Sequence, residues 1–340
     1  MKLVIPMAGR GTRLRPHSLT TPKPLLPVAG PMLIERIIQS FVESIDKKIV
    51  EIAFILGDFG KDVEHRLSHV AKKFGAKPVI YYQMEALGTA HAVNCAAASL
   101  SGEVIIAFAD TLFEIDGRLD LENAESLIWL KQVKDPSQFG VAVIEDGRIT
   151  RFIEKPKEPV SDMAIIGVYY FREGERLQNE LQYLMDNNIR GHKNEFDLTD
   201  AIDRLLNQGL LFQAANVQEW LDFGTIPAWL QSTAAVLNRS VSQVPDKEDS
   251  VRYHDTKIIQ PCYLGKNSHI SNSIIGPYAC IGDGCSISDS TVSRSIIRNH
   301  ATVNHSKLVN STVGETAEVY DCSQEIHIGD CSRIGNSDKI

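Results

Sequence analysis

The first two-thirds of the chain alternate short apolar runs with amphipathic stretches. Short apolar runs bounded by turn residues indicate buried strands, whereas apolar residues three and four positions apart indicate helices. Strands that alternate with helices in this way predict a mainly parallel sheet covered by helices. The predicted strands are 2–6, 50–56, 78–82 and 104–109, and the predicted helices are 33–44, 62–74, 89–99 and 199–207.

The predicted sheet also has an antiparallel part. Two further apolar runs, 139–144 and 148–153, are separated by Glu145, Asp146 and Gly147. An Asp-Gly pair between two apolar runs is a strong signal for a hairpin turn. The sheet is therefore expected to be mixed.

The pattern changes after about residue 241. The stretch 241–256 is polar and is predicted to be a linker, and beyond it aliphatic residues recur every five or six positions among Gly, Ser, Asn and Asp. This spacing predicts a β-helix, in which each short strand buries one aliphatic side chain before the chain turns to the next face. A β-sandwich of short strands is the alternative, but its strands would alternate apolar and polar residues. The recurring residues are Leu264, Ile270, Ile275, Ile281, Ile287, Val292, Ile297, Val303, Leu308, Val313 and Val319.

The length of the chain agrees with two domains. Its 340 residues are 43% hydrophobic and 23% charged, which is enough to bury a full core. We expect a catalytic domain over residues 1–240, a linker over 241–256 and a β-helix over 257–340.

The composition excludes several function classes. A formal net charge of -8 argues against general binding of nucleic acids or anionic membranes, because such partners require a basic face. The six cysteines include no CxxC pair and no Cys/His group at zinc spacing, so neither a zinc site nor a disulfide framework is expected. The sequence shows no secretory leader and no run of 18 apolar residues, which favours the cytoplasm.

One segment is basic, although the chain as a whole has a negative net charge. Residues 7–30 carry Arg10, Arg13, Arg15 and Lys23 but no acidic residue, and they directly follow the first predicted strand. Glycines in this segment allow backbone N–H groups to approach phosphates closely, and the basic side chains supply positive charge. The dinucleotide fingerprint is incomplete because its third glycine is replaced, and a Walker A motif is absent. The segment therefore predicts binding of a small polyanion.

Motifs along residues 1–230 carry a family resemblance. The basic segment reads GRGTRLRP followed by TTPKPLLPV, and YYQMEALGTAHAV, FAD, FGV, FIEKP, GVYYF, LTDAI and EWLDFGT follow in order. Together they resemble the sugar-1-phosphate nucleotidyltransferases, in particular glucose-1-phosphate thymidylyltransferases and uridylyltransferases. One departure is the first turn, MAGRG, where many members have AGGxG. The resemblance implies a Rossmann-like mixed, mainly parallel sheet covered by helices, followed by a left-handed β-helix of hexapeptide repeats.

The resemblance also implies a reaction. In this family a sugar-1-phosphate oxygen attacks the α-phosphorus of a nucleoside triphosphate and pyrophosphate leaves, so positioning and charge neutralisation dominate catalysis. Arg13 would hold the leaving phosphates, and Lys23 would bridge the nucleotide and sugar phosphates. Asp110 and Asp222 would hold Mg²⁺, which takes its other ligands from phosphates and water. Asp110 ends an apolar predicted strand, where open α/β sheets bind ligands, and is counted with Arg13 and Lys23 as catalytic.

The same resemblance assigns substrate-binding residues. The amide of Gln83 matches the carbonyl and imide N–H of uracil or thymine, which favours UTP or dTTP. His91 and Glu195 are weaker candidates. The nucleotide-binding set is Ala8, Gly9, Gly11, Thr12, Arg13, Gln83, Gly88 and Thr89, and the sugar-phosphate-binding set is Lys23, Gly140, Glu154 and Lys155.

Three other functions remain open. One is a bifunctional enzyme whose β-helix also transfers an acyl group, although His269, His300 and His305 lie in no acyltransferase motif. The others are a mannose-1-phosphate guanylyltransferase and a catalytically silent regulatory subunit of the same fold. In each case we expect small-molecule substrates or ligands, no nucleic-acid or membrane partner, and a homo-oligomer to which the β-helix contributes.

Overall fold

The computed structural model describes residues 1–114, 117–119, 121–158, 160–239 and 251–335. These residues group into two compact units. The first comprises Met1–Gly9 and Ile34–Leu221, and the second comprises Arg10–Leu33 and Asp222–Ile340. The basic segment after the first strand therefore groups with the C-terminal part of the chain. Most of the predicted linker, residues 241–250, lies outside the described residues.

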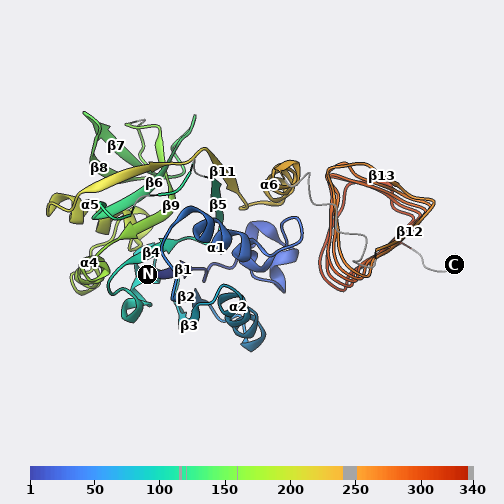
Figure 1. Cartoon of the computed structure of the whole chain (residues 1–340), viewed down its shortest axis with the longest axis horizontal. Coiled ribbons are helices and arrows are strands. Elements are labelled where there is room, and N and C mark those ends of the chain that lie inside the picture. Colours follow the sequence, from blue (N-terminus) through green and yellow to red (C-terminus); the bar gives the residue numbers. More distant parts are fainter. Residues whose placement is uncertain (115–116, 120, 159, 240–250, 336–340) are drawn as a thin grey trace. The chain divides into compact units, whose positions relative to one another are not determined.

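A nine-stranded mixed sheet forms the centre of the first unit (Figure 1). Its main path runs in the order β10-β6-β9-β4-β1-β2-β3. Strands β4, β1, β2 and β3 are mutually parallel, whereas β9 runs antiparallel to β4 and β6. The predicted mixed sheet, parallel around β1, is confirmed. The strands of this path are β1 (Lys2–Pro6), β2 (Glu51–Leu56), β3 (Lys77–Tyr82), β4 (Val104–Ala107), β6 (Ser126–Gln132), β9 (Met163–Phe171) and β10 (Phe212–Asn216).

Helices cover the sheet because its central strands are apolar on both faces. Val4 and Leu3 alternate between the two faces of β1, and both are fully buried. Helices α3, α4 and α5 supply the apolar cluster that packs around Val4. The predicted helix 89–99 is shorter than expected, because Ala96 leaves helical dihedral angles and a 3-10 turn follows. The helices of this unit are α1 (Leu33–Ser44), α2 (Lys61–Lys73), α3 (Thr89–Asn94), α4 (Gly174–Asp186) and α5 (Leu198–Asn207).

The predicted hairpin is confirmed. It consists of β7 (Gly140–Glu145) and β8 (Arg148–Glu154), and β7 also joins β9 through Val141. Asp146 and Gly147 in the turn have φ angles of 48° and 74°, the left-handed conformation that two-residue hairpin turns require. A separate two-stranded sheet pairs β5 (Thr111–Glu114) with β11 (Glu219–Asp222).

The C-terminal part of the second unit is a left-handed β-helix, whose triangular coils are visible in Figure 1. Equivalent strands of successive coils pair in parallel, so aliphatic side chains stack in columns. One column runs through Ile270, Ile287, Val303 and Val319, all 2% exposed or less. All-parallel pairing excludes the β-sandwich alternative. The coil strands are β12 (Arg252–His254), β13 (Lys257–Ile258), β14 (Tyr263–Leu264), β15 (His269–Ser271), β16 (Ile274–Ile275), β17 (Cys280–Ile281), β18 (Ser286–Ser288), β19 (Thr291–Ser293), β20 (Ile296–Ile297), β21 (Thr302–Asn304), β22 (Lys307–Val309), β23 (Thr312–Val313), β24 (Glu318–Tyr320), β25 (His327–Ile328) and β26 (Arg333–Ile334).

Buried serines explain how the β-helix turns its corners. Ser273, Ser290 and Ser306 occupy equivalent corners of successive coils, and each is buried. Each hydroxyl donates to a carbonyl of its own coil. The hydroxyls of Ser273 and Ser290 also accept the backbone N–H of the equivalent serine one coil on, at 3.0–3.1 Å. These bonds satisfy polar groups that would otherwise be buried without a partner.

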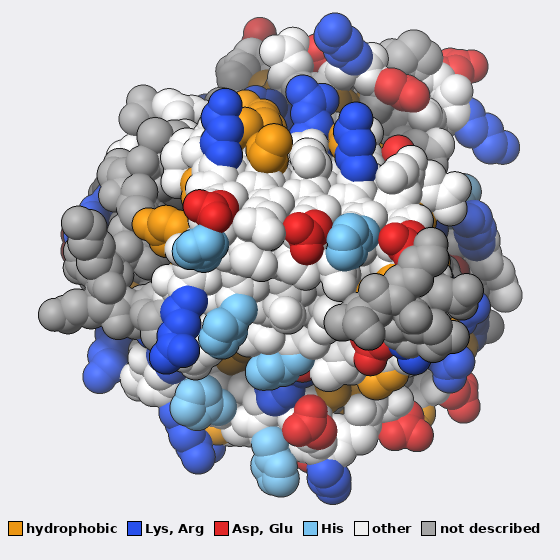
Figure 2. Space-filling model, turned by 90° about the vertical axis from the view of Figure 1, so that its right-hand side faces the viewer, with side chains coloured by type: hydrophobic (Ala, Val, Ile, Leu, Met, Phe, Trp, Pro, Cys, Tyr) orange, Lys and Arg blue, Asp and Glu red, His pale blue; other side chains and the backbone are white. Residues whose placement is uncertain are grey.

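The face of the β-helix seen in Figure 2 is largely polar. Figure 2 shows Lys, Arg and His side chains interspersed with acidic and uncharged ones, and hydrophobic side chains occur only in small groups. Ile274 and Tyr253 are the exposed large hydrophobic residues of the β-helix among those described, at 41% and 61%. No helix in the described part of the chain is both long and apolar enough to cross a membrane.

Candidate active site

Three candidate segments of the first unit meet at one edge of the sheet. Ala8 and Gly9 follow β1, Gln83 follows β3, and Asp110 lies three residues beyond β4. Because β1, β3 and β4 belong to one parallel group, their carboxyl ends lie at the same edge. The chain leaves β1 towards β2 on one side and later returns as β4 on the other, so this edge contains a topological switch point. Ligands of open α/β sheets bind outside such points.

The backbone after β1 is open to a ligand. A Cβ atom added at Gly9 would meet no heavy atom of the protein within 4 Å. Packing within the protein therefore does not require a glycine at this position. A glycine there leaves room for another molecule to approach the backbone closely.

Gln83 is held by the loop that follows it. Its side-chain nitrogen donates to the carbonyl of Gly88 at 3.0 Å and lies 3.1 Å from Nδ1 of His91. The amide nitrogen of Gln83 thus has two partners, one in the loop and one on α3. His91, on α3, is half-buried, and burial lowers its pKa, which favours the neutral ring that can accept from Gln83. Sequence reasoning ranked His91 low because its contact with Gln83 depends on the loop conformation.

Gly88 packs closely against another segment of the protein. A Cβ atom there would lie 2.5 Å from the carbonyl oxygen of Phe196 and 3.0 Å from Cβ of Glu195. The close backbone approach at Gly88 is therefore to the segment before α5. The backbone N–H of Ala90 donates to the Phe196 carbonyl, and Thr89 accepts the N–H of Leu198, which fixes this segment against α3.

The sugar-phosphate candidates gather beside the hairpin. Gly140 and Glu154 are paired residues of β7 and β8, and a Cβ atom at Gly140 would lie 2.9 Å from Glu154 Oε2. The Thr199 hydroxyl donates to that oxygen at 2.7 Å, and Lys155 forms an ion pair with Glu154 Oε1 at 3.0 Å. The structure thus brings Gly140, Glu154 and Lys155 together and adds Thr199, which the LTDAI motif contained but sequence reasoning left unassigned.

The backbone of Lys155 is strained. Its φ angle is 42°, in the left-handed region, and its N–H donates to the Phe139 carbonyl at 3.1 Å. A non-glycine residue in that region costs about 1 kcal/mol or more, and such strain often marks functional positions. The strained turn directs Lys155 back towards Glu154.

Two further carboxyl groups lie near Glu154. Asp197 is buried at the N-terminus of α5 and accepts the backbone N–H of His192 at 2.7 Å. Burial, reinforced by the charge of Glu154, raises the pKa of Asp197 to about 6. Burial and Glu154 also raise the pKa of Asp200. Glu154, Asp197 and Asp200 therefore form a group of interacting carboxyl groups beside the hairpin.

The phosphate-loop candidates lie in the second unit. Gly11 has a φ angle of 57°, and the Ser18 hydroxyl donates to its carbonyl at 2.7 Å. A Cβ atom at Gly11 would lie 3.3 Å from Cβ of Lys23, so the two ends of the loop are close together. Thr12 and Arg13 form one 3-10 turn (Thr12–Leu14) of the loop and are exposed, and Lys23 begins another (Lys23–Leu25) and is half-buried.

Arg13 lies beside the turn that carries Asp222. The Arg13 guanidinium is 3.2 Å from the position of a Cβ atom at Gly224, and the Gly224 N–H donates to Asp222 Oδ1 at 2.9 Å. Asp222 is exposed, so its carboxylate is accessible to solvent. Among the described residues, no three His, Cys, Asp or Glu side chains form a metal-binding group by themselves. Single carboxylates suit Mg²⁺, which completes its shell with phosphate and water oxygens.

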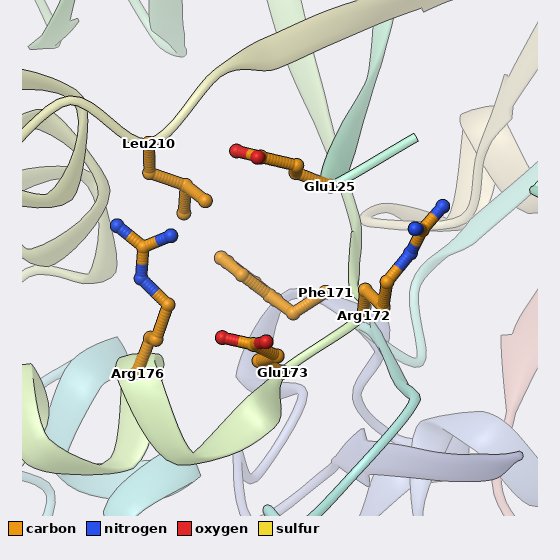
Figure 3. Close-up of a pocket in the computed structure, with 6 residues that line it drawn as sticks. All are labelled: Glu125, Phe171, Arg172, Glu173, Arg176 and Leu210. Carbon is orange, nitrogen blue, oxygen red and sulfur yellow. The ribbon is translucent and has the colours of Figure 1, made fainter. Parts of the chain in front are cut away.

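A pocket of about 180 Å³ lies elsewhere in the first unit (Figure 3). It contains none of the predicted site residues. Two arginines and two glutamates line it, so its formal charges cancel, and it is smaller than typical ligand sites of 300–1,000 Å³. Its lining residues are Glu125, Phe171, Arg172, Glu173, Arg176 and Leu210.

Comparisons with known proteins agree with this geometry. The family model described as "Nucleotidyl transferase" matches residues 2–239. A glucose-1-phosphate thymidylyltransferase of Streptomyces antibioticus is 28% identical over 100% of this chain and 99% of its own length. The bifunctional protein GlmU of Methanococcus maripaludis is 33% identical over 76% of this chain, which spans only 60% of that protein.

A solved structure shares the fold of the larger part of the chain. It is a Bacillus anthracis protein described as a glucose-1-phosphate thymidylyltransferase in complex with sucrose. The TM-score is 0.57 at 25% sequence identity, and the match covers 69% of this chain and 94% of that one. The chain therefore belongs to the nucleotidyl transferase family, as a sugar-1-phosphate nucleotidyltransferase with a C-terminal β-helix.

Proposed function

We propose that this enzyme transfers UMP or dTMP from the nucleoside triphosphate to a sugar-1-phosphate and releases pyrophosphate. The observation that carries the proposal is that Ala8, Gly9, Gln83 and Asp110 follow strands whose carboxyl ends lie at one edge of the sheet, the edge that contains the switch point. The segment at Ala8 and Gly9 offers accessible backbone, Gln83 offers an amide oxygen and Asp110 offers a carboxylate. A nucleotide needs these three kinds of contact for its phosphates, its base and its metal ion.

The base would be selected by Gln83. Its Oε1 would accept the imide N–H that uracil and thymine carry, while Gly88 and His91 hold its nitrogen. Cytosine has no N–H at the equivalent ring position, so CTP would leave that oxygen unpaired. A buried acceptor without a partner costs about 1–3 kcal/mol, enough to give a clear preference.

The phosphates would be held by the loop of the second unit. Arg13 would bind the leaving β- and γ-phosphates, and Lys23 would bridge the α-phosphate and the sugar phosphate. Asp110 and Asp222 would hold Mg²⁺, which supplies charge neutralisation and orientation of the phosphates when bound. The attacking oxygen belongs to the sugar phosphate, so the protein positions both substrates without forming a covalent intermediate.

The sugar would lie against the hairpin. Glu154, which is paired with Gly140 in the hairpin, would accept from hydroxyl groups of the sugar. Lys155, fixed by its ion pair with Glu154, would meet the sugar phosphate. Thr199 orients Glu154 through its hydroxyl.

A pyrophosphate-release assay tests the proposal. Purified enzyme with Mg²⁺ is given each of UTP, dTTP, CTP, ATP and GTP with glucose-, mannose-, galactose- and glucosamine-1-phosphate. We expect turnover with UTP or dTTP to exceed turnover with the other nucleotides. A preference for GTP with mannose-1-phosphate would identify a guanylyltransferase instead, and no turnover with any pair would favour a silent subunit.

The same preparation tests the acyltransferase alternative. We expect no acetyl-CoA consumption with glucosamine-1-phosphate as acceptor. Consumption that requires residues 251–335 would show a second activity in the β-helix.

A further inference from the structure

The basic loop packs on one face of the β-helix. Within the second unit, a Cβ atom at Gly329 would lie 3.2 Å from Pro16, and one at Gly30 would lie 2.5 Å from the Tyr263 ring. Gly329 follows β25 and Tyr263 is in β14, and both strands belong to the five-stranded face β14-β17-β20-β23-β25. The loop therefore contacts this face of the β-helix at two places, through Pro16 and through Gly30.

Arg298 makes the polar connection between that face and the loop. It follows β20, is only 4% exposed and pairs with Asp330 at 2.5 Å and with Glu315 at 3.3 Å. Its Nη2 also donates to the Thr21 hydroxyl at 2.9 Å. A buried guanidinium needs its charge and donors satisfied, and one of its partners here belongs to the loop.

Asp330 extends the same connection. One of its oxygens accepts from Arg298 and from the backbone N–H of Glu315, and the other accepts the Thr20 hydroxyl at 2.5 Å. Thr20 and Thr21 are thus held by two oppositely charged groups that are themselves paired. Removal of either charge would leave the other buried beside the loop.

The anchored threonines stand directly before Lys23. Only Pro22 separates Thr21 from Lys23, and its ring fixes φ at -53°. Thr21 is 5% exposed, so its backbone has little freedom. The bond between Thr21 and Arg298 therefore lies two residues from Lys23 along the loop.

A second contact between the loop and the β-helix lies after Arg13, at His17. His17 is fully buried, its Nε2 lies 2.7 Å from the Thr312 hydroxyl, and that hydroxyl lies 3.0 Å from Nδ1 of His327. Burial and the nearby charges of Arg298 and His327 lower the pKa of His17 to about 4. The charge of Asp330 acts in the opposite direction. The ring is therefore neutral at pH 7 and fits beside the Arg298 charge. The 3-10 turn of Arg13 ends three residues before His17.

We propose that the β-helix positions the phosphate-binding loop, with Arg298 as the positioning residue that acts on Lys23 through Thr21. The inference rests on the proposed roles of Arg13 and Lys23. Arg298 contacts no substrate, so its loss lowers the rate of transfer by misplacing Lys23. A displacement on the order of 1 Å costs roughly 10²-fold in rate.

Two substitutions test the connection from its two sides. Thr21→Val removes the loop hydroxyl at constant shape and leaves the Arg298 pairs intact, whereas Arg298→Met removes the charge from the β-helix. We expect each to lower kcat about 10- to 100-fold with a smaller change in the KM of either substrate. The double variant should be no worse than the poorer single variant, because both break one interaction. Arg298→Lys should recover part of kcat by restoring the charge.

Controls separate this inference from stability and from the proposed function. Arg294→Met removes an exposed arginine of the same β-helix and should retain wild-type kcat. If Arg298→Met does not fold, Thr21→Val decides the question. The positioning role is overturned if folded Thr21→Val and Arg298→Met keep kcat within about twofold of wild type while Lys23→Ala is inactive. If Lys23→Ala is fully active, the proposed function itself is wrong.

Discussion

At the scale of single residues, local contacts hold the side-chain amide of Gln83, the group that we propose selects the base. Its nitrogen is bound to Gly88 and His91. We expect Gln83→Ala to reduce the preference for UTP or dTTP over ATP by about 5- to 150-fold, which corresponds to about 1–3 kcal/mol. Competition assays with paired nucleotides measure this ratio. Met84→Ala, at an exposed neighbour, should leave the ratio unchanged.

The two metal-binding candidates give a second residue-scale prediction. Asp110→Asn and Asp222→Asn should each abolish nearly all turnover, because an amide cannot supply the negative charge that holds Mg²⁺ between phosphates. Rates measured over a Mg²⁺ titration should show that excess metal restores part of the activity. Asp186→Asn, at the exposed C-terminal end of α4, is the matched control. Full activity of both variants in EDTA would exclude the metal assignment.

The buried Asp197 predicts a dependence of stability on pH. Its pKa rises from 3.8 in an ordinary setting to about 6 in the fold, chiefly through burial. A raised carboxyl pKa means that the folded state prefers the protonated form, so stability falls as pH rises from about 4 to 6 and stays reduced above. Asp197→Asn should therefore stabilise the protein at pH 8, by about 1–3 kcal/mol.

Thermal unfolding at two pH values checks this prediction. The variant should melt at a higher temperature than wild type at pH 8 and at about the same temperature at pH 4. The amide retains an oxygen to accept the His192 N–H, so no hydrogen bond is lost. A variant that melts earlier than wild type at pH 8 would contradict the assignment of Asp197 as a destabilising charge.

At the scale of elements, Gly9 and Gly11, near the start of the basic segment, have different requirements. Gly11 has a positive φ and lies against Lys23, whereas Gly9 faces open space. Gly11→Ala should cost about 1–2 kcal/mol of stability from backbone strain and lower kcat by displacing Lys23. Gly9→Ala should leave the melting temperature unchanged and raise the KM for the nucleotide. Equal melting temperatures and KM values for the two variants would contradict this distinction.

The regular elements could be predicted from sequence because their signals are local. The strand 2–6 and the helix 33–44 appear with the predicted bounds, and the columns of the β-helix follow from an aliphatic residue every five or six positions. The hairpin follows from the dihedral preferences of Asp146 and Gly147.

The contacts that shape the candidate site could not be predicted in this way. Arg298 and Thr21 are 277 positions apart, and Thr199 and Glu154 are 45 apart. No local pattern marks either pair, since each depends on how the completed fold brings distant segments together. The raised pKa of Asp197 has the same origin, because burial and the charge of Glu154 arise only in the folded chain.

At the scale of the whole molecule, the β-helix leaves open how the chain assembles. The face seen in Figure 2 is polar and mixed in charge, with only small groups of hydrophobic side chains. Ile274 and Tyr253 are exposed, however, and coil edges of a β-helix favour coverage by another subunit. We expect a homo-oligomer whose mass by light scattering is a multiple of the chain mass. A strictly monomeric protein at micromolar concentration would contradict this expectation.

The interleaved course of the chain has a consequence for biosynthesis. The loop at residues 10–33 leaves the ribosome early, but His17 contacts Thr312, which is made 295 residues later. At about 5–20 residues per second, this interval is about 15–60 s. During that time the sheet of the first unit can form. The β-helix residues that contact the loop, such as Thr312, have not yet been made. The parts that would recognise the base and the sugar are thus synthesised before the β-helix residues that contact the loop.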